Sequence, residues 1–479
     1  MRGPWGRTGL ALALSGALLV ASCAVNPVTG KKELMLVSEG QEIALGEQTD
    51  KEVRAEYGLY DDADFAAYLP RTGGLLVPYS HRPKLPYHFA VLDSSVINAF
   101  AAPGGYIYVT RGLLALMNSE AELAAVLGHE LGHVTARHAA RSMSRQILVQ
   151  AGLAVGSLAS KTFAKIAGVA RVGAQLLFLK YSRDDERQAD ALGVTYARAA
   201  GYDPGEMVRF FQALQELGDL SGKNTLPGFL STHPLTKERI GNVQGLLAAD
   251  DAKLKTVGEG YLKRLEGLVY GDDPRQGYVE NSVFYHPGLR FLVVLPQGWN
   301  VQNTPTQLTV VSTDEKAALV LQAEKNAASL SSYAQQKAAA IEGRTLLDER
   351  SGTIHGLASL QQVFDVVQQN EPAVRLQNSF IRKGDIIYTL TALSAASDFG
   401  RFEGAFDQAV ASFRELTDRA YIDRAPKRVR LVPADVSRTL EAYFQSAGMD
   451  KKSWPQFAIM NGFKLDAVPP QGRLLKLVR

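Results

Sequence analysis

Cysteine is almost absent from this chain of 479 residues, because Cys23 is the only one. An intramolecular disulfide is therefore excluded, and with it a small fold held together by disulfides. The chain also lacks a strong excess of one charge: its formal net charge is +3, and no long basic stripe alternates with aromatic residues. We therefore expect no nucleic-acid partner.

Long apolar runs are missing as well. The most apolar internal region, residues 147–179, is interrupted by Lys161, Lys165 and Arg171, so no stretch approaches the roughly 20 residues that a membrane span needs. We interpret this region as buried or interfacial helices. With 46% hydrophobic and 21% charged residues, the composition is that of a globular protein, and the length favours two to four domains.

The N-terminus has the pattern of a secretory signal over residues 1–22: arginines near the start, a short apolar run and small residues before Cys23. Residues 20–23 resemble the bacterial lipobox, in which the cysteine is lipidated, whereas the alternative is an ordinary signal peptide followed by an incidental cysteine. A lone cysteine in a secreted chain favours lipidation. Because Ala24 follows it rather than Asp, the resemblance points to the outer membrane and to a protein on the periplasmic side.

The clearest helix runs from Ser119 to about Ser144, and Ser119 and Glu122 have the spacing of a capping box. Within it, His129 and His133 are four residues apart, so both imidazoles lie on one face and can bind one metal ion. Glu130 lies about 100° away around the helix axis, close to the ion without being a ligand. There it can take a proton from a water whose pKa zinc lowers to about 7.

A third protein ligand is expected from a second polar helix that begins near Asp184. Glu186 and Asp190 are again four residues apart, so that one can bind the metal while the other accepts the N–H of a ligating histidine. The residues alone do not decide between Asp184, Asp185 and Glu186. A solvated acidic helix start, favoured by the helix dipole, would also explain the first two.

Upstream of the metal motif, residues 87–92 and 106–110 are short aromatic and β-branched runs separated by Pro103-Gly104-Gly105, which predicts a strand, a turn and a strand. The second strand is a candidate edge to which an extended polypeptide adds by backbone pairing. An ordinary buried hairpin is the alternative interpretation.

Several stretches together resemble the bacterial lipoprotein branch of the M48 metallopeptidases, in the order found in that family and over roughly residues 24 to 245. They are Asn26-Pro-Val-Thr-Gly30, Asn98-Ala-Phe-Ala-Ala-Pro-Gly-Gly105, His129-Glu-Leu-Gly-His133, Tyr181-Ser-Arg183, Glu186-Arg-Gln-Ala-Asp190 and Ser231-Thr-His-Pro-Leu235.

The resemblance implies a mainly helical gluzincin-type metallopeptidase with a small β edge. It implies one zinc ion held by His129, His133 and Glu186, with Glu130 as the catalytic base and Asp190 as the partner of a ligand. Two departures from the family pattern are Gln188, where many relatives have an acidic residue, and residues 70–74, where relatives usually continue as a helix.

His233, before Pro234, has three interpretations: a capping or packing residue, an oxyanion stabiliser, or a reversible fourth ligand that would make the protease latent. The other histidines have no evident partner. We interpret His81, His88, His286 and His355 as surface or core residues, and His138 as helix surface.

The predicted organisation is multidomain α+β: signal peptide 1–22, lipid-anchored tether 23–37, peptidase domain 38–270, α+β domain 280–420 and a small module 428–479. The α+β segment resembles the PsbP-like fold through Pro296-Gln-Gly-Trp299, Tyr388-Thr-Leu390 and Ser412-Phe-Arg414. The last segment resembles a degenerate LysM module that lacks the usual Gly-Asp-Thr start. Peptidoglycan is therefore a candidate partner of residues 428–479.

The expected function is a zinc-dependent endopeptidase of the cell envelope that cleaves misfolded or unassembled polypeptides. The alternative is a lipid-anchored chaperone or assembly factor whose proteolysis is suppressed, and a third is a wall-binding scaffold with a vestigial catalytic domain. The intact set of metal-binding side chains argues against the scaffold.

Overall fold

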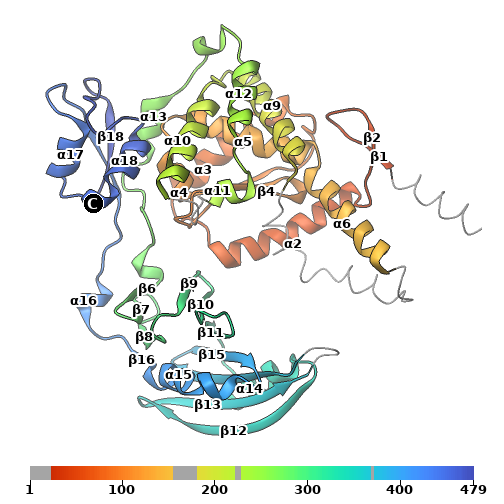
Figure 1. The fold of residues 1–479 in the computed structure, drawn as a ribbon, viewed down its shortest axis with the longest axis vertical. Helices are drawn as coiled ribbons and strands as arrows, with labels where there is room; N and C mark the ends of the chain where they lie inside the picture. Colours follow the sequence, from red (N-terminus) through yellow and green to blue (C-terminus); the bar gives the residue numbers. More distant parts are fainter. Residues whose placement is uncertain (1–22, 155–180, 222–227, 368–371) are drawn as a thin grey trace, which may run out of the picture. The chain divides into compact units, whose positions relative to one another are not determined.

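The computed structural model describes residues 23–154, 181–221, 228–367 and 372–479, and Figure 1 shows the course of the chain. The chain forms two compact units. The first contains the chain up to Gly271 together with Lys427–Arg479, and the second contains Asp272–Pro426 with the short stretch Ala55–Tyr57. The expected signal peptide and most of the apolar region 147–179 lie outside the described residues.

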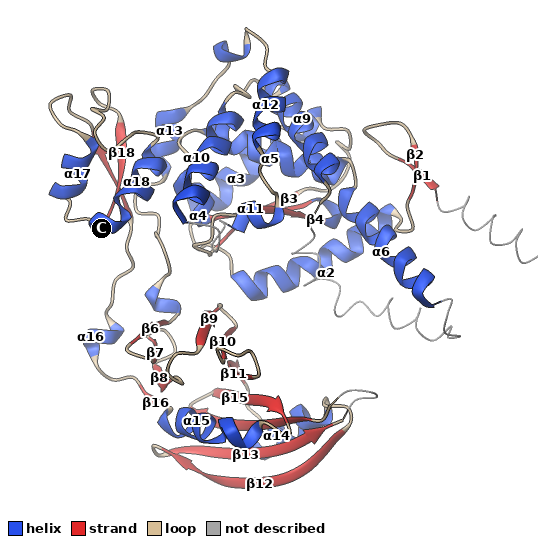
Figure 2. Ribbon diagram, viewed as in Figure 1, coloured by secondary structure: helices blue, strands red, loops and turns tan. Residues whose placement is uncertain are grey.

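Helices dominate the N-terminal part of the first unit (Figure 2). They are α2 (Glu39–Tyr57), α3 (Ala63–Gly74), α4 (Arg111–Leu116), α5 (Glu120–Thr135), α6 (His138–Ala154), α9 (Arg183–Ala199), α10 (Glu206–Ser221), α11 (Gly228–Thr232), α12 (Lys237–Leu246) and α13 (Gly258–Arg264). Within the described ranges, no helix combines the length and apolar character that crossing a bilayer would require. Residues 70–74 are part of α3 despite Pro70, so the expected departure from a helical course is wrong.

A small sheet accompanies these helices, with the order β3 (His88–Leu92), β5 (Tyr106–Thr110), β4 (Ala99–Ala102). The predicted strand, turn and strand omitted β4: the Pro103–Gly105 turn joins β4 to β5, and β3 pairs with β5 in parallel. The prediction that β5 is the edge strand is therefore wrong. β5 is central, and β4 is an edge.

The helix expected from Ser119 to Ser144 is two helices. Ser119 caps α5 by accepting from Glu122 N, but the Glu122 carboxylate accepts from Asn118 N rather than completing a capping box with Ser119. The chain breaks between α5 and α6 at Arg137, whose φ of 55° is left-handed. The Arg137 guanidinium, buried against Glu42 and the Val37 carbonyl, holds this turn in place.

The N-terminal hairpin β1 (Cys23–Val25) and β2 (Lys32–Leu34) is attached to the end of α5. Asn26 is fully buried; its amide nitrogen donates to the Ala136 carbonyl, and its oxygen accepts from Val28 N and Thr29 N. Asn26 therefore ties the segment after Cys23 to the end of the helix that carries His129 and His133.

The C-terminal segment of the first unit consists of β17 (Val429–Pro433), α17 (Leu440–Ser446), α18 (Trp454–Asn461) and β18 (Leu474–Val478). β17 and β18 pair antiparallel, and the apolar side chains of the segment share one core with the helices of the first unit. Lys476 is fully buried and donates to the carbonyls of Ala115, Leu116 and Met117 at the end of α4. This segment is thus continuous with the unit that carries the histidine motif.

The second unit is rich in β structure. A seven-stranded sheet has the order β12-β13-β14-β15-β11-β10-β9, and a four-stranded sheet has the order β16-β8-β7-β6. The strands are β6 (Tyr278–Glu280), β7 (Val283–His286), β8 (Phe291–Val294), β9 (Asn300–Asn303), β10 (Gln307–Val311), β11 (Ala317–Lys325), β12 (Arg344–Ile354), β13 (Leu357–Val366), β14 (Val374–Lys383), β15 (Ile386–Ala395) and β16 (Arg414–Glu415); the helices are α14 (Leu330–Ala339), α15 (Phe399–Ser412) and α16 (Arg419–Ile422). The predicted class, a mainly helical region followed by an α+β region, is confirmed.

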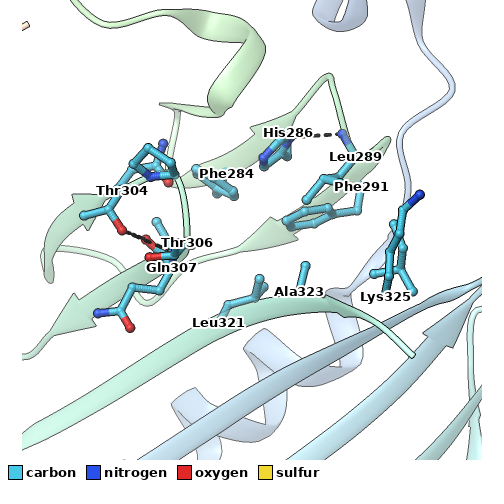
Figure 3. Close-up of a pocket in the computed structure, with 14 residues that line it drawn as sticks. Phe284, His286, Leu289, Phe291, Thr304, Thr306, Gln307, Leu321, Ala323 and Lys325 are labelled. Carbon is cyan, nitrogen blue, oxygen red and sulfur yellow. Dashed lines mark hydrogen bonds between the residues drawn. The ribbon is translucent and has the colours of Figure 1, made fainter. Parts of the chain in front are cut away.

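A pocket of about 230 Å³ opens in this second unit (Figure 3). Phe284, Phe291 and Leu321 contribute apolar walls, and His286 also lines the pocket. His286 Nδ1 accepts from Leu289 N, and burial lowers the pKa of His286 to about 4. The imidazole is therefore uncharged at neutral pH.

Candidate metal centre

Two helices bring the metal-binding side chains together. His129 and His133 project from α5, and Glu186 projects from the first turn of α9. The Nε2 atoms of His129 and His133 are 3.0 Å apart. The Glu186 carboxylate lies 3.7 Å from the first and 3.5 Å from the second of these nitrogens, so all three side chains converge on one point.

Glycines let α5 and α9 approach closely enough for this convergence. A Cβ at Gly128 would lie 3.0 Å from the Gly193 carbonyl oxygen, and one at Gly132 would lie 3.1 Å from Ala189 Cα. These neighbours are backbone atoms, which cannot move aside as a flexible side chain can. The small residues therefore determine how near Glu186 comes to the two imidazoles.

The donor set fits a zinc ion. Four buried residues, His129, His133, Glu186 and His233, offer ligand atoms that all lie within 4.8 Å of one another. Tetrahedral zinc with bonds of about 2.0–2.1 Å separates its ligands by about 3.3 Å, close to the 3.0–3.7 Å observed among the first three. Burial also lowers the pKa of His133 well below its usual range, which keeps the imidazole neutral and able to bind a metal.

Asp190, the expected partner of a ligand, lies beside His129. Its Oδ1 is 2.9 Å from His129 Nδ1. Arg239, on α12, donates to both Asp190 oxygens at 2.7 Å and lies 2.8 Å from Glu186. Although burial opposes it, the hydrogen bond from Arg239 holds the pKa of Asp190 below its usual range.

Glu130 is fully buried, and neither carboxylate oxygen has a hydrogen-bond partner among the described residues. Burial raises its pKa, since a carboxylate loses solvation in the interior. An orphaned buried carboxylate is costly unless it has a ligand or a reaction to serve. Glu130 is therefore the one member of the motif that remains free for chemistry.

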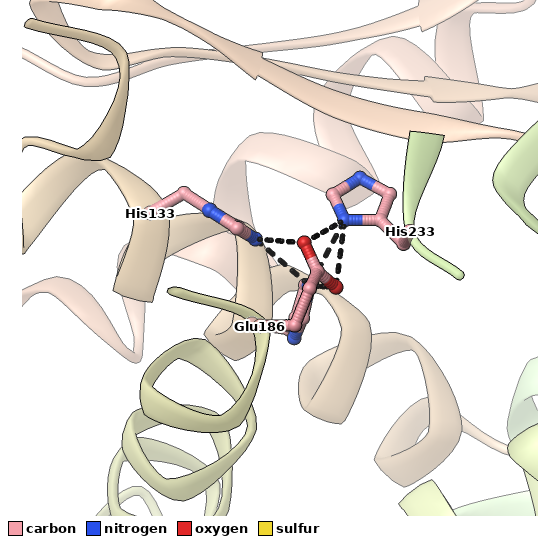
Figure 4. A group of neighbouring side chains, drawn as sticks. His133, Glu186 and His233 are labelled. Carbon is pink, nitrogen blue, oxygen red and sulfur yellow. Dashed lines mark hydrogen bonds and ion pairs between the residues drawn. The ribbon is translucent and has the colours of Figure 1, made fainter. Parts of the chain in front are cut away.

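His233 follows α11 and enters the same group of side chains, as Figure 4 shows with His133 and Glu186. Its Nδ1 is 3.1 Å from Glu186 Oε1 and 3.3 Å from His129 Nε2, and its Nε2 is 3.6 Å from Glu130 Oε1. Burial lowers the pKa of His233, but the Glu186 and Glu130 carboxylates outweigh that effect and raise it. His233 thus lies with the three predicted ligands.

His138 is fully buried, so its interpretation as helix surface is wrong. Its Nδ1 lies 2.9 Å from His133 Nδ1, and its Nε2 lies 2.9 Å from Gln188 Oε1. Burial lowers the pKa of His138 to about 4. The prediction for His138 failed because a left-handed turn at Arg137 changes the course of the chain one residue before it. In a continuous helix the His138 side chain would lie on a different side.

The two acidic alternatives to Glu186 have other roles. Asp184 has a side chain 84% exposed and pairs with Arg187. Asp185 completes a capping box with Ser182 and pairs with Arg141.

Two residues near the metal group were not singled out individually from the sequence: Arg239, and Tyr181, whose ring stacks on His133 at 4.1 Å. Helix periodicity carried no signal for either.

Comparison with known proteins agrees with this geometry. Residues 66–247 match the model of peptidase family M48. The chain is therefore similar to peptidase family M48 over these residues. His129, His133, Glu186 and His233, the buried group whose donors fit a zinc ion, all lie within the matched residues.

Curated relatives are similar to parts of this chain. A beta-barrel assembly-enhancing protease of Yersinia pestis is 32% identical over 226 residues, which cover 46% of this chain and 46% of the relative. A mitochondrial metalloendopeptidase OMA1 of Arabidopsis thaliana is 31% identical over 44% of this chain and 41% of its own. The metalloprotease LoiP of Escherichia coli is 28% identical over 35% of this chain and 66% of its own. The chain thus spans about half the length of the first of these relatives.

Among solved structures, a cyanobacterial PsbP of Synechocystis is similar over 29% of this chain and 91% of its own, with 13% identity and a TM-score of 0.23. The similarity to family M48 therefore rests on the sequence match, and this structural likeness adds no argument.

Proposed function

We propose that the protein is a zinc-dependent endopeptidase of the bacterial cell envelope that cleaves misfolded or unassembled polypeptides. The observation that carries this proposal is Glu130: a fully buried carboxylate one position after His129, with His233 Nε2 3.6 Å from its Oε1 and no hydrogen bond among the described residues that ties it to a structural role. The names of the relatives support a protease, and the secretory pattern before Cys23 supports the envelope.

Zinc, when bound, supplies a Lewis acid that polarises the scissile carbonyl and makes water more acidic. In this proposal His129, His133 and Glu186 hold the ion, and Arg239 and Asp190 keep the Glu186 and His129 side chains oriented. Glu130 takes a proton from the water that attacks the carbonyl carbon, and then delivers that proton to the nitrogen that leaves as an amine. Its raised pKa, caused by burial, brings it closer to the operating pH of such a base.

The edge strand β4 is the candidate site for the substrate backbone. It contacts α5 and pairs with β5 on one side only. An extended polypeptide can add to such an edge through main-chain hydrogen bonds, which recognise chain extension more than sequence. This mode suits unfolded clients, because a folded protein does not offer a free extended segment.

The test compares wild type with Glu130→Gln on an unfolded casein-like substrate, with and without a chelator. Cleavage lost in both the variant and the chelated wild type supports the endopeptidase. Cleavage that survives Glu130→Gln contradicts the assignment of the base. If both proteins keep an unfolded client soluble although neither cleaves it, the chaperone alternative is favoured.

His233 has two candidate roles in this site. Its Nδ1 lies near enough to Glu186 and His129 to be a fourth donor that suppresses cleavage. Alternatively, a protonated His233, favoured by the two neighbouring carboxylates, stabilises the developing oxyanion. His233→Ala should raise cleavage in the first case and abolish it in the second.

We further propose that a lipid on Cys23 attaches the protein to the outer membrane, and that residues 428–479 contact peptidoglycan. Cys23→Ser should abolish incorporation of labelled palmitate and release the protein from membranes. Because residues 428–479 share the core of the first unit, glycan binding should be measured with the full chain. Sedimentation with purified peptidoglycan tests this partner, and failure to sediment contradicts it.

A further inference from the structure

The Nδ1 atoms of the two α5 histidines, which face away from the metal group, have different partners. His129 Nδ1 faces the Asp190 carboxylate at 2.9 Å, and that carboxylate is fixed by Arg239. His133 Nδ1 instead faces another imidazole, that of His138, also at 2.9 Å. A ligating histidine usually donates its second N–H to a carboxylate, a carbonyl or water, so an imidazole in this place is unusual.

The metal site determines where the protons lie along the path from His133 through His138 to Gln188. His133 Nε2 faces His129 Nε2 and Glu186 at 3.0 and 3.5 Å, so its lone pair must lie on that nitrogen if it is a ligand. The proton of neutral His133 is then on Nδ1. One proton serves the contact between the two Nδ1 atoms, so His133 donates and His138 accepts.

The same reasoning determines the direction of the hydrogen bond between His138 and Gln188. With its Nδ1 accepting, neutral His138 carries its proton on Nε2. That N–H points at Gln188 Oε1, 2.9 Å away, and an amide oxygen is an acceptor. The opposite polarity would place the His133 proton on Nε2, where it would block the metal. A carboxylate, Asp185, is 3.7 Å from His138 Nε2 but is engaged by Arg141 and by Ser182 N.

We propose that His138 and Gln188 are positioning residues that hold His133 in its metal-binding tautomer and ring orientation. His138 acts as an acceptor for His133, and Gln188 acts as an acceptor for His138, so the path carries no formal charge. This inference rests on the proposed assignment of His133 as a ligand. It gives Gln188, the departure from the acidic residue of many relatives, a function.

The main test is zinc affinity, measured on the full-length apo-protein by competition with a chromophoric chelator. His138→Phe keeps a ring but removes the acceptor, and should weaken zinc binding by about 10–100-fold. His138→Asn places an amide oxygen near the position of Nδ1 and should bind within a few-fold of wild type. His88→Phe is the matched control, because His88 is exposed and stacks on Tyr106 away from the site.

Gln188→Leu and Gln188→Glu provide a second pair at a half-buried position that disturbs folding less. Gln188→Leu should weaken zinc binding, whereas Gln188→Glu keeps an acceptor and should bind at least as tightly as wild type. Equal zinc affinity for wild type, His138→Phe and Gln188→Leu overturns the inference, as does equal weakening in His138→Phe and His138→Asn.

Nitrogen-15 NMR of histidine-labelled, zinc-loaded protein reports the tautomers directly. We expect His133 protonated on Nδ1 and His138 protonated on Nε2; a proton on His138 Nδ1 overturns the inference. Its failure is distinguishable from failure of the proposed function. If wild type binds no zinc at all, the zinc peptidase itself is refuted, whereas tight wild-type binding that these variants leave unchanged refutes only the path through His138.

Discussion

Replacing Lys476 with methionine should destabilise the unit that carries the zinc site. Lys476 Nζ donates to the carbonyls of Ala115, Leu116 and Met117 at 2.9, 3.0 and 2.9 Å, and the side chain is fully buried. These carbonyls end α4, and residues 117–119 connect α4 to the start of α5. Lys476→Met leaves three buried acceptors without their donor.

The expected loss of unfolding free energy follows from the buried polar groups that lose their contact with Lys476. Glu122, in the first turn of α5, is the carboxylate whose charge acts on Lys476, and burial raises the pKa of Glu122 while it lowers that of Lys476. A buried acceptor that loses its donor costs about 1–3 kcal/mol, and three carbonyls lose the same donor here, so we expect a loss of about 3–5 kcal/mol. For a unit of this size, that loss corresponds to a fall in melting temperature of roughly 6–20 °C.

The assay is denaturant unfolding of the full chain, followed by the fluorescence of Trp454. This residue is buried in α18, where its Nε1 donates to the Met449 carbonyl, and Trp5→Phe and Trp299→Phe remove the signals of the two other tryptophans. Lys464→Met, an exposed lysine of the same segment, is the control and should change the free energy of unfolding by less than about 0.5 kcal/mol.

A double-mutant cycle strengthens this test. Adding Glu122→Gln to Lys476→Met removes the buried carboxylate that has lost the charge of the nearby lysine, so the double variant should be less destabilised than the sum of the single variants by about 0.5–3 kcal/mol. If Lys476→Met unfolds at the same denaturant concentration as Lys464→Met, the reasoning about the buried ammonium group is refuted.

Three further predictions concern the site and the second unit. Arg239→Gln removes the guanidinium group that contacts Asp190 and Glu186, and should weaken zinc binding about 10–100-fold in chelator competition. Unchanged zinc affinity would contradict the proposal that Arg239 orients these two side chains. Gly128→Ala should push α9 away from α5 and likewise weaken zinc binding, whereas Gly245→Ala, with open space at its Cβ, should not. For His286, the folded pKa of about 4 lies below the ordinary value of 6.5, so the unfolded chain binds more protons between these pH values. Stability is then fully present above about pH 6.5 and is lost by about 3 kcal/mol as the pH falls toward 4; His286→Phe should remove this dependence in melts of the second unit.

The helix faces that carry the metal group were predictable from sequence because helix spacing is local, whereas the choice of Glu186 over Asp184 and Asp185 came from the family resemblance. The spacing of His129 and His133 within one helix, and of Glu186 and Asp190 within another, determines which side chains share a face. Helix periodicity does not say how two helices approach each other. Gly128 and Gly193 settle that approach through contacts between residues 65 positions apart, which no local pattern contains.

The residues that the sequence did not reveal act across such distances. Arg239 reaches Asp190 from another helix, and His138 reaches His133 only because the chain turns at Arg137. In the second unit, β12 carries little sequence signal of a strand, because its residues are mostly exposed at the sheet edge, without the alternation that marks a half-buried strand. The long-range partner of Lys476 could not be predicted either, since it lies some 360 residues away.

Diffraction at the zinc absorption edge from zinc-loaded crystals tests the central claim most directly. One anomalous peak should lie about 2.0–2.2 Å from Nε2 of His129, Nε2 of His133 and a carboxylate oxygen of Glu186, with Glu130 nearby but not coordinated. A peak elsewhere in the chain, or one from which Glu186 is absent, would contradict the account.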